Sequence, residues 1–316
     1  MLQILKKIFI FLIPLLIITT TVEIYLRVMP SRYKSKRDGL VQNANDVQIL
    51  ILGHSHAANG INPLDFSLTA HNLAFGSQTI YFDRKLLEKY LPILPQLKYV
   101  IISFDYTTLY RENNYDRNFF YKYYYDIDYK EQKFFKEYIL QSVFVYSPYT
   151  TLQIMISNLK NRGELNLIKG WDGSYPNSDY HLITSPLILQ ERIHNLNKDI
   201  LDGENKEYIL NDLEFMIDTL NSLDVKTILI NFPIYKELRE KFDKEVVKKN
   251  QEAAYYLIQK YDVIYLDYLD SDEFTIDDYY DSDHLNRYGA AKLTAKVDSV
   301  IKEFDFIKNN FSPDLK

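Results

Sequence analysis

Two short segments of the chain, more than 200 residues apart, carry residue types that could form a serine nucleophile system. Residues 53–56 read GHSH, and residues 281–286 read DSDHLN. A serine becomes a nucleophile when a histidine takes its proton and a carboxylate orients that histidine. We therefore predict Ser55 as the nucleophile, His284 as the general base and Asp281 as the orienting acid.

Each of these assignments has a plainer alternative. A serine at the start of a helix is often only an N-cap, and a histidine in a loop rich in aspartates can serve only the loop. Asp283 also competes as the acid, because it is adjacent to His284 in the sequence. Side chains of adjacent loop residues tend to diverge, whereas a D-x-x-H turn lets both side chains face one way, which favours Asp281.

The nucleophile and the base need a fold that brings their segments together, and the pattern between them predicts one. Helical patterns, among them one long helix over 235–261, alternate with apolar runs and indicate a three-layer αβα sandwich with a mainly parallel sheet. Sites in such sheets gather at the carboxyl ends of the strands, where Ser55 is expected. The five predicted strands are residues 47–52, 71–75, 99–104, 226–231 and 263–267.

The composition is that of a globular protein and excludes several kinds of chemistry. The chain has 316 residues, of which 47% are hydrophobic and 25% charged, with a formal net charge of -6. It contains no basic block of the size that nucleic-acid binding uses, and the acidic balance argues against that class. Cysteine is absent, which excludes disulfides, thiolate metal sites and cysteine nucleophiles.

The N-terminus is expected to hold a membrane anchor. Residues 8–26 contain one charge, Glu23, and follow two lysines. A spanning helix needs roughly 20 mostly apolar residues, and a small-x-small cleavage site does not follow. We predict an uncleaved signal anchor, although the basic residues from Arg27 onward oppose an outside body and a buried helix of the soluble domain is the alternative. Residues 1–37 then form a cytoplasmic stub, the anchor and a juxtamembrane linker.

The two motifs together resemble those of the SGNH/GDSL hydrolase superfamily, and most closely its membrane-anchored bacterial branch, which is related to alginate O-acetylation and D-alanyl-transfer proteins. The match covers about residues 46–104 and 212–304. The D-x-x-H-L-N segment with Gly289 after it is the more specific half. The first motif is less specific, because His54 stands where the commoner pattern has an aspartate.

The resemblance implies a flavodoxin-like sheet and a catalytic domain over residues 38–316, with an insertion at about 106–199. It implies the same roles for the serine, histidine and aspartate as the residue types do. The backbone N–H groups of Ser55 and Gly76 would form the oxyanion hole. The resemblance implies no metal and no organic cofactor.

One usual oxyanion donor of that family is missing. The strand at 99–104 runs into Asp105-Tyr106-Thr107, without a Gly-x-Asn-Asp segment. An ionised Asp105 can only accept hydrogen bonds, so either two backbone donors suffice or Thr107 or another residue serves. One such donor is worth about 3 kcal/mol, or a hundredfold in rate. Both Asp105 and Thr107 are expected near the substrate.

Two further features have a chemical and a plain interpretation. His54 and His56 have the spacing of a metal-binding pair, but His71, His181 and His194 lack suitable strand-end positions, so no metal site is predicted. His56 is expected to line the substrate pocket or to pack. Trp171, in the insertion, could stack on a sugar ring or could belong to a small core of the insertion itself.

The sequence as a whole predicts a membrane-anchored serine esterase or O-acyltransferase, with its catalytic domain on the extracytoplasmic side of a bacterial inner membrane. The resemblance implies an envelope polysaccharide as acceptor, acetyl as the acyl group and a multi-pass membrane protein that exports the acyl group as partner. The alternative is a catalytically weak or inactive envelope protein of the same fold, which binds glycan or assembles a complex.

Overall fold

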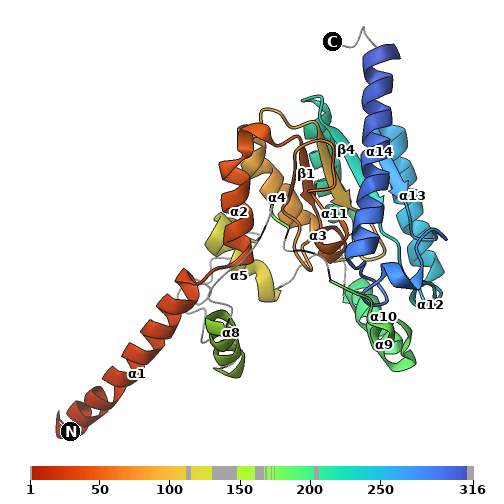
Figure 1. The fold of residues 1–316 in the computed structure, drawn as a ribbon. Helices are drawn as coiled ribbons and strands as arrows, with labels where there is room; N and C mark the ends of the chain where they lie inside the picture. Colours follow the sequence, from red (N-terminus) through yellow and green to blue (C-terminus); the bar gives the residue numbers. More distant parts are fainter. Residues whose placement is uncertain are drawn as a thin grey trace. The chain divides into compact units, whose positions relative to one another are not determined.

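Five apolar segments form one parallel sheet in the computed structural model, with strands β1 to β5 numbered in chain order (Figure 1). Their spatial order is β2-β1-β3-β4-β5, and every neighbouring pair is parallel. This is the flavodoxin-like order of a doubly wound sheet, so the predicted α/β fold and its five strands are confirmed. The strands are Ile49–Leu52, Ala70–Asn72, Tyr99–Ser103, Lys226–Asn231 and Val263–Asp267.

The register places alternate residues of the central strands on opposite faces of the sheet. Ile51 pairs with Ile101, which pairs with Ile228 on the next strand. These three side chains are fully buried on the face that packs against α3 (Ser55–Gly60) and α14 (Arg287–Phe311). The residues between them are equally buried, as expected of a parallel sheet that is covered on both sides.

The opposite face carries the other long helices. Helix α4 (Ile80–Tyr90) packs against α11 (Lys206–Asn221). Helix α13 (Lys244–Lys260) lies beside α11 and is joined to it by an ion pair of 2.7 Å between Lys260 and Glu214. The predicted three-layer αβα sandwich is therefore confirmed.

Further helices occur between these elements in the chain. Residues of the expected insertion form α9 (Tyr180–Thr184) and α10 (Pro186–Asp202). Three single-turn 3-10 helices occur at Ala44–Asp46, Leu91–Ile93 and Ile276–Asp278. The last of these lies directly before the segment that contains His284.

Two local expectations differ from the structure. The single helix predicted over 235–261 is divided into α12 (Lys236–Arg239) and α13, because Asp243 leaves the helical conformation and its side chain accepts the Glu245 N–H at 2.8 Å as an N-cap. The expected linker instead contains α2 (Arg32–Gln42). Lys36 of this helix is buried and donates to the carbonyl of Ala74 at 2.6 Å.

The chain divides by its contacts into two compact units, Met1–Ser35 with Tyr115–Asn166, and Lys36–Asn114 with Leu167–Lys316. The sheet and the candidate site belong to the second unit. The predicted boundary at residue 37 and the single insertion remain predictions. The structure describes residues 2–111, 115–129, 148–160, 167, 169–171, 173, 175–202 and 206–311.

The first unit contains α1 (Leu2–Val28), α5 (Tyr115–Tyr125) and α8 (Pro148–Lys160). Most apolar side chains of α1 are exposed, with Phe11 73% accessible, whereas Leu26 is buried. Within the described residues, this is the one helix long and apolar enough to cross a membrane, and a signal sequence would meet the same criteria. The kind of membrane and the orientation remain predictions.

Candidate active site

A sharp turn after β1 presents Ser55 at the carboxyl edge of the sheet. Gly53 follows the strand with φ +117°, and His54 caps α3, in which Ser55 is the first residue. A Cβ on Gly53 would lie 2.2 Å from Ser103 Oγ at the end of β3. The turn therefore requires glycine, both for its backbone conformation and for the close approach of the two strand ends. The Gly53 N–H donates to the buried carboxyl of Asp83 at 2.8 Å.

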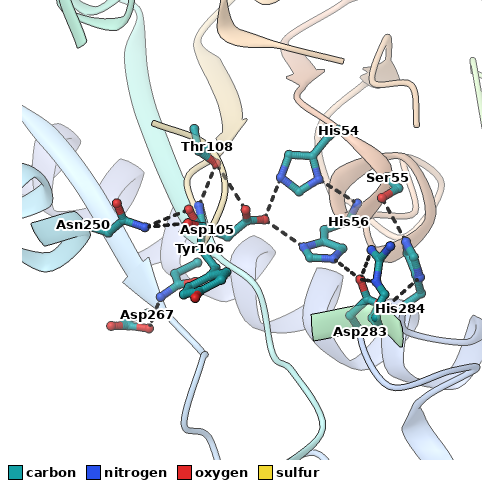
Figure 2. Close-up of polar contacts among 12 residues, drawn as sticks. His54, Ser55, His56, Asp105, Tyr106, Thr108, Asn250, Asp267, Asp283 and His284 are labelled. Carbon is teal, nitrogen blue, oxygen red and sulfur yellow. Dashed lines mark hydrogen bonds and ion pairs between the residues drawn. The ribbon is translucent and has the colours of Figure 1, made fainter. Parts of the chain in front are cut away.

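The residues predicted as nucleophile, base and acid lie together (Figure 2 shows the serine and the histidine). Ser55 Oγ is 2.9 Å from His284 Nε2. The other ring nitrogen, Nδ1, is 3.0 Å from each carboxylate oxygen of Asp281 and 3.4 Å from Oδ1 of Asp283. Nδ1 is thus closer to Asp281 than to the competing acid.

Backbone hydrogen bonds hold the acid and the base in place. Oδ1 of Asp281 accepts the N–H groups of Asp283 at 3.0 Å and of His284 at 2.8 Å. Behind this turn, the Asn286 amide donates to the carbonyls of Asp277 at 2.6 Å and Tyr279 at 3.2 Å. The D-x-x-H-x-N spacing therefore has a structural reason, because Asn286 closes the loop that presents the histidine.

A second group of titratable side chains lies beside these residues. Asp105 follows β3 and is 3% exposed. Its Oδ2 is 2.8 Å from His54 Nε2 and 2.8 Å from His56 Nδ1. The Thr108 hydroxyl is 3.2 Å from its Oδ1, and the Asn250 amide holds the backbone carbonyl at 3.2 Å. The carboxylate therefore faces two histidines, and the expected substrate contact of Asp105 stays a prediction.

The two histidines differ in charge. Burial lowers the pKa of His54 in spite of Asp105, and its Nδ1 accepts the His56 N–H at 3.4 Å, so the ring is neutral with its proton on Nε2. Burial alone would also lower the pKa of His56, but Asp105 and Asp283 together raise it to about 9. His56 is therefore an imidazolium at neutral pH. Burial opposes the ionised form of Asp105, but the two histidines hold its pKa well below the usual value.

Arg192 of α10 completes this network, and sequence reasoning missed it. Its Nε donates to Asp283 Oδ2 at 2.8 Å, and its Nη2 contacts the same oxygen. Burial would raise the pKa of Asp283, but His284, His56 and Arg192 hold it well below its usual value. A buried carboxylate such as that of Asp283 needs a cationic partner. The sequence around position 192 carries no signal that marks Arg192 as this partner.

The expected insertion also fixes the loop that carries the acid and the base. The carbonyl of Tyr175 accepts the Arg287 N–H at 2.8 Å, and the Asp179 N–H donates to the carbonyl of Tyr280 at 2.9 Å. The rings of Tyr175 and Tyr280 stack with their centroids 3.7 Å apart, and that of Tyr175 is 6.0 Å from that of His284. Tyr175 therefore lies at the site, although only Trp171 was singled out from this segment.

The remaining predicted residues are placed less directly. Gly76 follows Phe75, whose N–H donates to the Gly53 carbonyl at 3.1 Å, two residues before Ser55. Thr107 is buried and lines a small cavity with His54. Trp171 follows Gly170, where a Cβ would lie 2.2 Å from the carbonyl of Asn72, so it lies beside the edge strand β2. Substrate binding by Thr107 and Trp171 stays a prediction.

Two sets of donor atoms are close enough to share a metal ion, namely His54, His56 and Asp105, and His56, Asp283 and His284. Tetrahedral zinc bonds of about 2.0–2.1 Å would separate such donors by roughly 3.3 Å. The 2.8 Å separations in the first set are shorter than that, and the contact at His56 Nδ1 has the geometry of a hydrogen bond. In the second set, His284 Nε2 already contacts Ser55 Oγ. Neither set is therefore assigned as a metal site.

No protein-family model and no curated protein matches the chain. Several solved structures are similar to it. Three of them are a proposed acylhydrolase from Bacteroides fragilis NCTC 9343 (11% identity, TM-score 0.42, 86% of this chain and 95% of that chain), a GDSL-like lipase from Bacteroides thetaiotaomicron VPI-5482 (10%, 0.42, 86% and 99%) and a proposed platelet activating factor from Streptococcus pneumonia (13%, 0.38, 89% and 97%). With identities and TM-scores this low, the geometry of the site has to carry any functional conclusion.

Proposed function

We propose that the chain is a serine esterase or O-acyltransferase that works through an acyl-enzyme. One observation carries this proposal, namely the continuous chain of contacts from Ser55 Oγ through both ring nitrogens of His284 to Asp281. This is the arrangement in which a histidine takes the serine proton while a carboxylate stabilises the imidazolium that forms. The alternative role of Ser55 as an N-cap is disfavoured, because His54 occupies the cap position.

The proposed reaction uses these groups in two steps. Ser55 Oγ attacks the acyl carbonyl and passes its proton to His284 Nε2, which returns the proton to the departing alcohol. Water or an acceptor hydroxyl then attacks the acyl-enzyme by the same route and releases Ser55. The oxyanion of each tetrahedral intermediate would accept the backbone N–H groups of Ser55 and Gly76. The hydrogen bond between Phe75 and Gly53 supports this role, because it holds the Gly76 segment beside the turn.

The proposal extends to the place of action and the substrate class. Helix α1 would anchor the enzyme in a bacterial inner membrane, with the catalytic unit on the extracytoplasmic side. In the transferase form, an envelope polysaccharide would accept the acyl group, with acetyl favoured, and a multi-pass membrane protein would deliver it. In the esterase form, an acylated glycan would be the substrate. The support is the length and apolar character of α1 and the resemblance of the two motifs. Anchoring would raise the local concentration of the enzyme near such a donor.

A serine-reactive fluorophosphonate probe tests the proposed nucleophile in the full-length protein. We expect labelling that disappears in Ser55→Ala and remains in Ser282→Ala, a matched serine in the second motif that is buried and that the proposal leaves without a chemical role. The probe reports on the activated serine without knowledge of the substrate. Folded wild-type protein that is not labelled, or equal labelling of Ser55→Ala, would contradict the proposal.

The second candidate is a non-catalytic protein of the same fold that binds envelope glycan. One observation favours it. Asp105 stands where the family has its additional oxyanion donor, and its carboxylate contacts two histidines instead. Absence of probe labelling together with retained glycan binding would support this candidate. If the purified enzyme instead deacylates small esters and ignores every glycan hydroxyl offered, the transferase form of the proposal fails and the esterase form stands.

A further inference from the structure

His56 lies between two carboxylates, next to the proposed catalytic histidine (Figure 2). Its Nδ1 is 2.8 Å from Asp105 Oδ2, and its Nε2 is 3.4 Å from Asp283 Oδ2. A ring whose two nitrogens both face carboxylates donates on both sides only when it is doubly protonated. The geometry alone therefore assigns a positive charge to a side chain whose ring centroid is 5.3 Å from that of His284.

The carboxylate of Asp283 is a shared partner of His56 and His284. Oδ2 of Asp283 receives His56 and Arg192, whereas its Oδ1 is 3.4 Å from His284 Nδ1. Asp283 is therefore directed mainly toward two cations and only distantly toward the base. Asp281, by contrast, offers both of its oxygens to Nδ1 at 3.0 Å.

We propose that His56 is a positioning residue: as an imidazolium held between Asp105 and Asp283, it draws Asp283 away from His284 and leaves Asp281 as the acid that orients the base. This inference rests on the proposed function, because it concerns the same base. In this proposal, Asp105 holds one ring nitrogen of His56, and Asp283 is held at the other. The site thus uses an acid, a cation and an acid in series beside the nucleophile.

The charged groups around this series predict how the base titrates. His56 faces Asp105, Asp283, His54 and His284, and the uncharged ring of Phe232 covers it from the end of β4. His284 faces Asp281 and Asp283, Ser55 and the ring of Tyr175. Without the positive charge of His56, the negative charge of Asp283 is neutralised less completely. An additional effective negative charge next to His284 favours its protonated form, so the base works only at a higher pH.

The pH dependence of ester hydrolysis by the full-length enzyme tests this inference. We expect His56→Gln to move the acid limb of the kcat/KM profile upward by about one pH unit. The double variant His56→Gln/Asp283→Asn should return the limb toward the wild-type position, because the uncompensated carboxylate is gone. His181→Gln, at an exposed histidine outside the site, is the control and should leave the profile unchanged. An unmoved limb in His56→Gln, or an uncorrected shift in the double variant, would overturn the inference.

A second readout separates this inference from the proposed function. Labelling with 13Cε1-histidine reports the ring titrations of the full-length protein in detergent, whether or not it hydrolyses esters. The chain has six histidines, so single substitutions identify each signal. We expect the wild-type His56 signal to remain that of an imidazolium at pH 7.5. A His56 ring that titrates near pH 6.5, its ordinary value, would refute the inference even in an active enzyme.

Discussion

The two ends of the parallel sheet both carry charged residues, but in different surroundings. At the carboxyl ends, His54, Asp105 and Asp283 are all less than 7% exposed and contact one another through His56. At the amino ends, the pair between Lys308 and Asp224 measures 2.8 Å, but the two side chains are 41% and 82% exposed. Water screens the second kind of pair and does not reach the first.

This difference explains why only one end can do the proposed chemistry. An exposed ion pair is worth about 0–1 kcal/mol. Removing the partner of a buried carboxylate destabilises a protein by about 3–5 kcal/mol. Buried carboxylates therefore strongly affect the pKa and the position of neighbouring side chains. Charged side chains therefore affect the proposed base at the carboxyl ends, whereas the pair between Lys308 and Asp224 lies on the surface.

The largest expected effect is on catalysis at the carboxyl ends. Asp281→Asn should lower kcat for ester hydrolysis by roughly 10³- to 10⁴-fold, because an amide no longer selects the correct tautomer of His284. Asp283→Asn, the matched change at the competing acid, should lower kcat only several-fold. The two rates, measured on one small ester with equal folding verified by circular dichroism, decide the assignment. A larger loss in Asp283→Asn would exchange the roles of the two acids.

The next effect is on stability, at the turn that presents the nucleophile. Gly53→Ala should lower the free energy of unfolding by about 3 kcal/mol, because it combines backbone strain with a Cβ only 2.2 Å from Ser103 Oγ. Gly173→Ala is the matched control, since Gly173 has φ +85° but no atom within 4 Å of its Cβ position. It should cost about 1 kcal/mol. Equal losses in denaturant unfolding would show that contact at Gly53 contributes nothing.

Stability should also depend on pH through His56. Its pKa is raised to about 9 in the folded protein, above the unfolded value of about 6.5. The contribution of His56 is therefore fully present below pH 6.5 and is lost as the pH rises through about 9. Melting temperatures between pH 6 and 9.5 should fall for the wild type and fall less steeply for His56→Gln. Parallel curves would mean that His56 has no raised pKa.

The smallest effect is expected at the amino ends. Lys308→Ala removes an exposed partner of Asp224 and should change the free energy of unfolding by less than about 1 kcal/mol. Ester hydrolysis and its pH profile should remain those of the wild type. A loss of activity in this variant would contradict the distinction between the two ends of the sheet.

Much of the fold could be predicted from the sequence because its signals are local. The bounds of all five strands lie within three residues of the predicted runs, since apolar β-branched runs between helical patterns have few other stable arrangements. Boundaries that depend on capping were missed, such as the break at Asp243. The helical linker was missed as well, because it depends on burial of Lys36 against a distant carbonyl.

The candidate site was predictable only in part, because some of its contacts join segments that are distant in the sequence. Ser55, His284 and Asp281 could be identified because a serine at a strand end and a D-x-x-H turn together supply the parts of a nucleophile system. Arg192 and Tyr175 could not be identified, because an arginine or a tyrosine in an irregular segment has no spacing that marks it. The two histidine partners of Asp105 could not be identified either, because they lie about 50 residues earlier in the chain.

By itself, then, the sequence determined the parallel sheet, the strand-end position of Ser55 and the local D-x-x-H turn. Each of these follows from side-chain periodicity or from hydrogen bonds within a few residues. Only the tertiary structure decided that His284 reaches Ser55, that Asp283 pairs with Arg192 and that His56 carries a charge between two acids. Those properties depend on burial and on contacts between distant segments, which no local pattern encodes.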